Sequence, residues 1–243
     1  METKVSQRFV VVAAIFITCL ITANIIAVKL ITIGGLTLPA AIIIFPASYI
    51  FGDILTEVYG YRRARTVIWL GFFCNLIAVV AIWLGGLLPA LDQEVQEAWG
   101  LTLSYAPRLL LASFIAYLVG EFANSFVLAK MKIRTKGRWL WSRTIGSTIV
   151  GQGLDAVVFI TIAFAGTQPW GILATIILTH WLVKTGYEAV ATPFTYAVVN
   201  YLKKKEGIDT YDYDTKFNPF GFSIERVRSG WKLVGGAIKE KLL

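Results

Sequence analysis

The chain has 243 residues, of which 56% are hydrophobic and only 16% charged, and its mean hydropathy is +0.66. Soluble domains carry about 25% charged residues. Here the depletion comes in blocks, which is typical of a polytopic membrane protein and excludes an ordinary soluble domain. The net charge is +8, but the basic residues gather at the ends of apolar runs. The charge therefore indicates membrane orientation rather than binding of nucleic acid.

Six apolar segments are each long enough for the ~20 residues that a helix needs to cross the hydrocarbon core. In chain order they cover 9–31, 38–60, 65–89, 107–130, 143–166 and 169–201. The last is over-long, and we expect Pro193 to kink it or to mark where it leaves the membrane. Short turns such as TIGGLTLP and one longer polar loop, LDQEVQEAWGLTLSYA, join the segments. The sequence predicts an all-α membrane protein with a six-helix transmembrane domain at 1–202, whose first span is retained rather than cleaved as a signal peptide.

The distribution of lysine and arginine predicts the orientation. Most of the 23 basic residues lie before the first segment, after the second, between the fourth and fifth, or after the sixth. The opposite loops have only Arg108 at a boundary, and they hold Asp92, Glu94 and Glu97. By the positive-inside rule, both termini are cytoplasmic.

Residues 203–243 form a polar tail that we expect on the cytoplasmic side. Its apolar residues recur at helical spacing with Arg and Lys between them, at Ile224, Val227, Trp231, Val234 and Ile238. This pattern favours a basic amphipathic helix that lies on the anionic inner leaflet or caps the cytoplasmic mouth. A solvated, disordered tail is the alternative.

Charged residues inside spans are rare, and most mark a site, a pathway or an internal ion pair. Apart from the basic residues at span ends, the six found here are Asp53, Glu57, Glu121, Asp155, Lys184 and Glu188. Other polar side chains in the spans, most of them on the same helical stripes, are Asn24, Tyr49, Gln152 and His180. Because lipid satisfies none of them, the stripes face inward around a central polar cavity. Glycines such as Gly120 and Gly151 are expected to allow close helix approach there.

The buried charges do not balance, since five acids face Lys184 as the one firmly central base. Some carboxylates must be protonated, paired with Lys184 or awaiting a cationic ligand. Lys184 and Glu188 are four residues apart, which suits an internal ion pair that holds the bundle together. Asp53 and Glu57 share a helix face and repel one another, so we expect the unliganded pair to share a proton.

Catalytic patterns are missing from the sequence. One histidine and no HExxH spacing exclude a zinc protease, and no GxSx-type stretch offers His180 a serine nucleophile. No P-loop is present, so ATP coupling would need another subunit. These observations favour a transporter over an enzyme, without a metal or cofactor. A membrane enzyme that uses the carboxylates as acid and base is a further alternative.

Five stretches carry a family resemblance: FPASYIFGDILTEVYGYRRAR, ASFIAYLVGEFANSFV, STIVGQGLDAVVFITIAF, HWLVKTGYEAVATPF and IDTYDYDTKFNPF. In this order, over nearly the whole chain, they resemble the queuosine precursor transporter family, also called vitamin uptake transporters. The residues that match the family's motifs are Phe45, Pro46, Asp53, Glu57, Gly151, Gln152, Asp155 and Lys184. The resemblance implies a bundle similar to the substrate-binding subunits of energy-coupling-factor transporters, in the cytoplasmic membrane of a prokaryote. It also implies import of 7-cyano-7-deazaguanine, 7-aminomethyl-7-deazaguanine or queuine.

The polar residues suit such a substrate. The adjacent N1–H and 2-amino groups of a deazaguanine fit one carboxylate, its carbonyl needs a donor, and its flat ring suits an aromatic face. We expect substrate binding by Asp155, Asp53, Gln152, Asn24, Lys184, Phe45 and Tyr49. We expect gating or proton coupling by Glu57, Glu121, His180 and Glu188.

Two questions about partners stay open in the sequence. The alternative function is a vitamin-binding subunit that works with an ATPase module in an ATP-driven importer. Small-residue helix faces permit a homodimer, although packing within one chain explains them as well.

Overall fold

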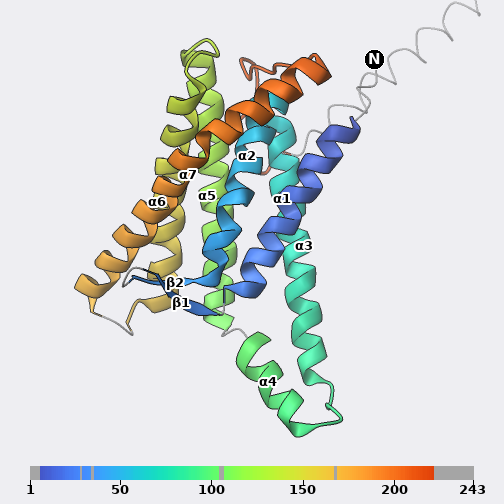
Figure 1. Cartoon of the computed structure of the whole chain (residues 1–243), viewed down its shortest axis with the longest axis vertical. Helices are drawn as coiled ribbons and strands as arrows, with labels where there is room; N and C mark the ends of the chain where they lie inside the picture. The colour runs from blue at the N-terminus through green and yellow to red at the C-terminus, as the bar shows by residue number, and fades with distance from the viewer. Residues whose placement is uncertain (1–5, 28, 34–35, 104–106, 167–168, 222–243) are drawn as a thin grey trace, which may run out of the picture.

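The computed structural model describes residues 6–27, 29–33, 36–103, 107–166 and 169–221 (Figure 1). Its long helices are α1 (Gln7–Ile26), α2 (Phe45–Tyr59), α3 (Tyr61–Leu87), α5 (Pro107–Arg134), α6 (Leu140–Phe164) and α7 (Trp170–Glu206). The shorter elements are strands β1 (Leu30–Ile33) and β2 (Leu36–Pro39), the 3-10 turn η1 (Ala40–Ile43) and helix α4 (Gln93–Leu103). Apart from one hairpin, the regular elements of the described residues are helices, in agreement with the predicted class.

Helix α2 is the centre of the bundle. It contacts α1, α3, α5 and α7, and most of its side chains are buried. A helix of 15 residues spans about 22 Å, which is less than the ~30 Å of the hydrocarbon core. Because its neighbours surround it, α2 can hold polar residues that lipid would not accept.

Four helices in the described part of the chain are long and apolar enough to cross a membrane. They are α1, α3, residues 110–134 of α5, and α6. Helices α2 and α7 coincide with the other two expected spans, but α2 is short and α7 carries His180, Lys184 and Glu188 along its length. The chain is therefore a multi-pass membrane protein by composition, while six crossings remain a prediction.

Several expected boundaries were wrong at the end of the bundle where the hairpin lies. The first helix ends at Ile26 and α2 begins only at Phe45, whereas the sequence predicted spans of 9–31 and 38–60. Between them, β1 and β2 pair antiparallel, with Leu30 opposite Pro39 and Ile33 opposite Leu36. The β-branched residues in this stretch favour extended backbone. The polar loop after α3 likewise contains a helix, α4.

Helices α5 and α6 pack side by side through glycine (Figure 1). A Cβ built on Gly151 would lie 2.7 Å from Cβ of Asn124 and 2.9 Å from the carbonyl oxygen of Gly120. A Cβ on Gly120 would lie 2.9 Å from Cβ of Asp155. The predicted close approach at Gly120 and Gly151 is therefore confirmed, and it brings the polar residues of α6 next to α5.

The segment after α7 folds back onto the bundle instead of extending from it. The backbone N–H of Tyr61, at the start of α3, donates to Asp212 at 3.0 Å, and Arg65 donates to the carbonyl of Asn218 at 2.7 Å. Trp69 Nε1 donates to the carbonyl of Pro219 at 2.8 Å. We call residues 207–221 the strap. The predicted amphipathic helix further along lies outside the described residues.

The start of α1 and the end of α7 lie at the same end of the bundle (Figure 1). Arg8 of α1 forms an ion pair with Glu206 of α7, with an N–O distance of 3.3 Å. The junction of α2 and α3 and the turn between α5 and α6 lie at this end, and the hairpin and α4 lie at the other. The basic residues identify the first end as cytoplasmic under the positive-inside rule, and this orientation remains a prediction.

Candidate functional site

A small cavity lies between α2, α6 and α7. The described residues that line it are Phe45, Pro46, Tyr49, Thr148, Gln152, Lys184 and Glu188. Its volume is about 10 Å³, room for about one water molecule. Five of the residues proposed from the sequence, namely Phe45, Tyr49, Gln152, Lys184 and Glu188, therefore meet around one space although they come from three distant segments.

Aromatic rings form one wall of the cavity. Phe45 and Tyr49 are one turn apart on α2, with ring centroids 5.2 Å apart. The ammonium of Lys184 lies over the Phe45 ring, 4.2 Å from its centroid. Such a cation–π contact is strengthened by burial, because water does not compete for the ammonium.

Lys184 is bound to Asp155 across the α6–α7 interface. Its Nζ lies 2.7 Å from Oδ2 of Asp155, and both residues are 7% exposed. The pairing of Lys184 with Glu188 that their spacing suggested was wrong, because a carboxylate of α6 holds the ammonium instead. Asp155 does not line the cavity, and it fixes the position of a residue that does.

Besides Glu57, whose other oxygen is held by cations, three buried carboxyl groups carry an oxygen with no hydrogen-bond partner among the described residues. They are Oδ2 of Asp53, Oε2 of Glu121 and Oε1 of Glu188, on α2, α5 and α7. Each residue is at most 1% exposed, and both Asp53 and Glu121 interact electrostatically with Glu188. We call these three residues the carboxyl cluster. Unpaired buried acceptors are costly, so such oxygens favour a bound proton or a donor from a ligand.

The other oxygen of Asp53 is already used. Asn124 Nδ2 of α5 donates to Oδ1 of Asp53 at 2.7 Å. Gln152 Oε1 and Thr148 Oγ1, which line the cavity from α6, have no hydrogen-bond partner among the described residues. The cavity thus presents unused polar atoms from α6 as well as from α7.

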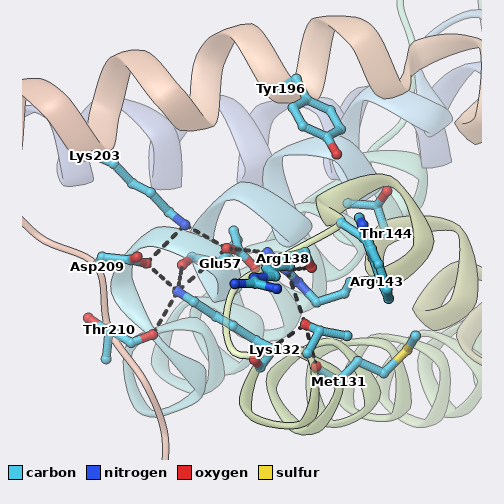
Figure 2. A network of polar contacts seen from close by, with 12 residues as sticks. Glu57, Met131, Lys132, Arg138, Arg143, Thr144, Tyr196, Lys203, Asp209 and Thr210 are labelled. Carbon is cyan, nitrogen blue, oxygen red and sulfur yellow. Dashed lines mark hydrogen bonds and ion pairs between the residues drawn. The ribbon is translucent and has the colours of Figure 1, made fainter.

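Glu57 forms a separate ionic network at the end of the bundle that holds the strap (Figure 2). Its Oε1 lies 2.7 Å from Nη2 of Arg143 and 2.6 Å from Nζ of Lys203. Lys132 lies 3.5 Å from the same oxygen. The expectation that Glu57 shares a proton with Asp53 was wrong, because three cations from α5, α6 and α7 compensate its charge.

The strap completes this network. Asp209 lies 2.6 Å from Nζ of Lys132 and 2.9 Å from Nζ of Lys203, and Lys132 also donates to the carbonyl of Thr210 at 2.8 Å. We call Glu57, Lys132, Arg143, Lys203 and Asp209 the Glu57 network. It joins four helices and the strap at one point.

Sequence reasoning missed four members of the Glu57 network. Lys132, Arg143 and Lys203 were counted only as orientation signals, and Asp209 as part of a polar tail. Arg143 is 1% exposed, which its place at the start of an apolar segment does not reveal. The excess of carboxylates in the spans was the signal that could have revealed these residues, because buried carboxylates need cations from other parts of the chain.

Two further predicted residues, Asn24 for binding and His180 for gating or proton coupling, are not among the described residues that line the cavity. Asn24 is partly exposed on α1. His180 is partly exposed, one turn before Lys184 on α7, and interacts electrostatically with it. Their expected roles remain predictions.

Comparison with known proteins identifies the family. Residues 39–198 match the family model described as "Putative vitamin uptake transporter". Over 189 residues the chain is 29% identical to a Bacillus subtilis (strain 168) protein named "Probable queuosine precursor transporter", covering 76% of this chain and 82% of that protein. No solved structure matches the chain. The family match spans more than half of the chain and includes every residue that lines the cavity, so the chain belongs to the vitamin uptake transporter family and is a transporter, not an enzyme.

Proposed function

We propose that the protein imports 7-deazaguanine precursors of queuosine through the central cavity, across the cytoplasmic membrane of a prokaryotic cell. The substrates are 7-cyano-7-deazaguanine, 7-aminomethyl-7-deazaguanine or queuine. The name of the Bacillus subtilis relative supports this substrate class. The single observation that carries the proposal is the cavity, where aromatic rings, an ammonium and unpaired acceptor oxygens meet.

The chemistry of the cavity suits a flat, polar base. The rings of Phe45 and Tyr49 offer an apolar face for a bicyclic ring. Lys184 offers a donor to a carbonyl, while Gln152 and Glu188 offer acceptors to N–H groups. A donor-rich base would satisfy atoms that are unpaired among the described residues, and such pairing gives a site its selectivity.

Transport requires the cavity to open, because about 10 Å³ is far below the ~300–1,000 Å³ of usual ligand pockets. Phe45, Tyr49, Asp53 and Glu57 follow one another along α2 from the hairpin end toward the Glu57 network. A base bound at Phe45 would travel about 18 Å along this stripe, at 1.5 Å per residue. We propose that the Glu57 network is the inner gate on that path.

The carboxyl cluster supplies a means of energy coupling. Asp53 and Glu121 do not line the cavity and have no cation within ion-pair distance among the described residues, so a proton on one of them is the simplest way to relieve their burial. We propose that substrate and proton cross together. ATP coupling through a separate ATPase module is the alternative, and the two make opposite predictions in a purified system.

The test is uptake of radiolabelled 7-cyano-7-deazaguanine into proteoliposomes that contain only this protein. We expect accumulation when the outside is made acidic, abolished by excess unlabelled base and by a proton carrier. Protein-free liposomes are the control. Binding of the base without any uptake until an ATPase pair is added would support the alternative, and no binding would refute the proposed substrate.

A further inference from the structure

Five buried carboxylates in the bundle are candidates to receive the N1–H and 2-amino groups of the base: Asp53, Glu57, Glu121, Asp155 and Glu188. A suitable residue must line the cavity and must not be neutralised by another side chain. It must also have an acceptor oxygen free for a ligand. These conditions separate the five, and the selection rests on the function proposed above.

Four of the candidates fail at least one condition. Glu57 is held by Arg143 and Lys203 at the far end of α2, and Asp155 is neutralised by Lys184. Asp53 and Glu121 each have an unpaired oxygen, but neither is among the described residues that line the cavity. The family-motif aspartates are therefore poorly placed to touch the base.

Glu188 meets all three conditions. It lines the cavity, is 1% exposed, and its Oε1 has no partner among the described residues. No cation among those residues lies within ion-pair distance of it, because its helical neighbour Lys184 reaches across to Asp155 instead. We propose that Glu188 is the residue that recognises the N1–H and 2-amino groups, and that Asp155 acts by positioning Lys184.

The order of residues along α7 supports this assignment. A guanine-type base presents its carbonyl, its N1–H and its 2-amino group in sequence along one edge. Lys184 and Glu188 are one helical turn apart, so they present a donor followed by an acceptor on one face, with Cβ atoms about 5–6 Å apart. This order is complementary to the edge of the base, while Phe45 and Tyr49 on α2 face its ring.

An unpaired oxygen on a second helix of the cavity fits the same pose. Gln152 lines the cavity from α6, which packs against α7, and its Oε1 has no partner among the described residues. In this pose it is placed to receive an N–H from the five-membered ring of the base. Helix α7 then contacts the six-membered edge of the base, α6 contacts the opposite edge, and α2 covers the face of the ring.

The experiment compares two ligands in matched variants. Dissociation constants are measured for 7-cyano-7-deazaguanine and for its analogue without the 2-amino group, in the wild type, Glu188→Gln, Asp155→Asn and the exposed control Glu97→Gln. The ratio of the two constants reports the 2-amino contact. Unlike absolute binding capacity, this ratio does not depend on the fraction of protein that is folded.

We expect the wild type and Glu97→Gln to prefer the 2-amino ligand roughly ten- to a hundredfold, as a bidentate pair would give. In Glu188→Gln an amide N–H faces the 2-amino group, so the preference should fall to about threefold or less. Asp155→Asn should weaken both ligands, because Lys184 loses the anion that holds it beside the cavity. Glu188→Asp, which retains the charge on a shorter arm, is the second variant and should also lower the ratio.

The outcomes separate this inference from the function on which it rests. If Glu188→Gln or Glu188→Asp keeps the wild-type ratio, Glu188 does not recognise the 2-amino group, and the transport proposal is unaffected. If Asp155→Asn binds both ligands as tightly as the wild type, Asp155 does not position Lys184. If the wild type binds neither ligand, the inference and the proposed substrate both fail.

Discussion

The carboxylate of Glu57 on α2 lies 2.7 Å from the guanidinium of Arg143 on α6, and both residues are 1% exposed. Lys203 of α7 contacts the same oxygen at 2.6 Å. One carboxylate therefore joins helices that are far apart in the sequence. Breaking such a buried pair on one side leaves an uncompensated charge, which is costly in a low-dielectric interior.

Replacement of Glu57 tests how much the Glu57 network contributes to the free energy of unfolding. Glu57→Gln should lower the free energy of unfolding by about 3–5 kcal/mol, because Arg143 remains buried without its anion. Glu206→Gln is the matched control, since it breaks the ion pair with the exposed Arg8 and should cost less than about 1 kcal/mol. Thermal unfolding of both variants in detergent measures the difference. Equal losses in the two would show that the Glu57 network adds no special stability.

The Lys184–Asp155 pair is open to a double-mutant cycle. Asp155→Asn alone should destabilise the protein by about 3–5 kcal/mol, because the ammonium of Lys184 loses its anion inside the bundle. Adding Lys184→Met removes the stranded charge, so the double variant should be more stable than the Asp155→Asn variant. If the second substitution instead adds its full cost, the two residues are not coupled.

The α5–α6 contact predicts opposite effects of the same substitution at two glycines. Gly151→Ala should destabilise by about 1–3 kcal/mol, because the new methyl group meets Asn124 and the backbone of Gly120. Gly186→Ala, on the exposed face of α7 where a Cβ meets nothing within 4 Å, should stabilise by about 0.5–1 kcal/mol. The shifts in thermal unfolding midpoint should therefore have opposite signs, and a Gly151→Ala variant as stable as the wild type would contradict the close approach of α5 and α6.

The strap should detach in acid. Partial burial opposes ionisation of Asp209, but hydrogen bonds from Lys132 and Lys203 outweigh it and hold the pKa of this carboxyl below its usual value. The stabilising contribution is therefore complete above the usual pKa of about 3.9 and is lost as the pH falls through the lowered pKa. Hydrogen exchange of residues 207–221, corrected for intrinsic rates, should show full protection at about pH 5 and reduced protection near pH 3.

A variant separates this titration from general acid unfolding. Asp209→Asn should reduce protection of the strap already at pH 7, while protection of α5 and α6 stays unchanged. Protection of the strap that is equal in the variant and the wild type at every pH would mean that Asp209 does not hold it in place.

Much of the fold follows from local patterns in the sequence. The blocks of apolar residues located the long helices, and the i, i+4, i+8 spacing of Tyr49, Asp53 and Glu57 located the polar face of α2. Inward orientation followed because lipid does not solvate a carboxylate. Phe45, Gln152, Lys184 and Glu188 were accordingly predicted in the site and meet at the cavity.

The ion pairs could not be predicted from local sequence patterns, because they depend on contacts between helices. Lys184 was matched with Glu188 on its own helix, whereas the packing of α6 against α7 gives it Asp155. Glu57 was expected to share a proton with Asp53, whereas its carboxylate contacts Arg143 and Lys203, which lie 86 and 146 residues away in the sequence. Helical periodicity describes one face of one helix and contains no information on which face lies opposite.

The most direct test of the proposed transport function is thermal stabilisation of the purified protein by a panel of ligands. The panel holds guanine, queuine, 7-cyano- and 7-aminomethyl-7-deazaguanine, riboflavin, thiamine and biotin. A ligand at 100 times its Kd should add about 2.7 kcal/mol of stability. We expect stabilisation by one or more of the 7-deazaguanines that is weakened in Glu188→Gln. Stabilisation by a vitamin alone would contradict the proposed function.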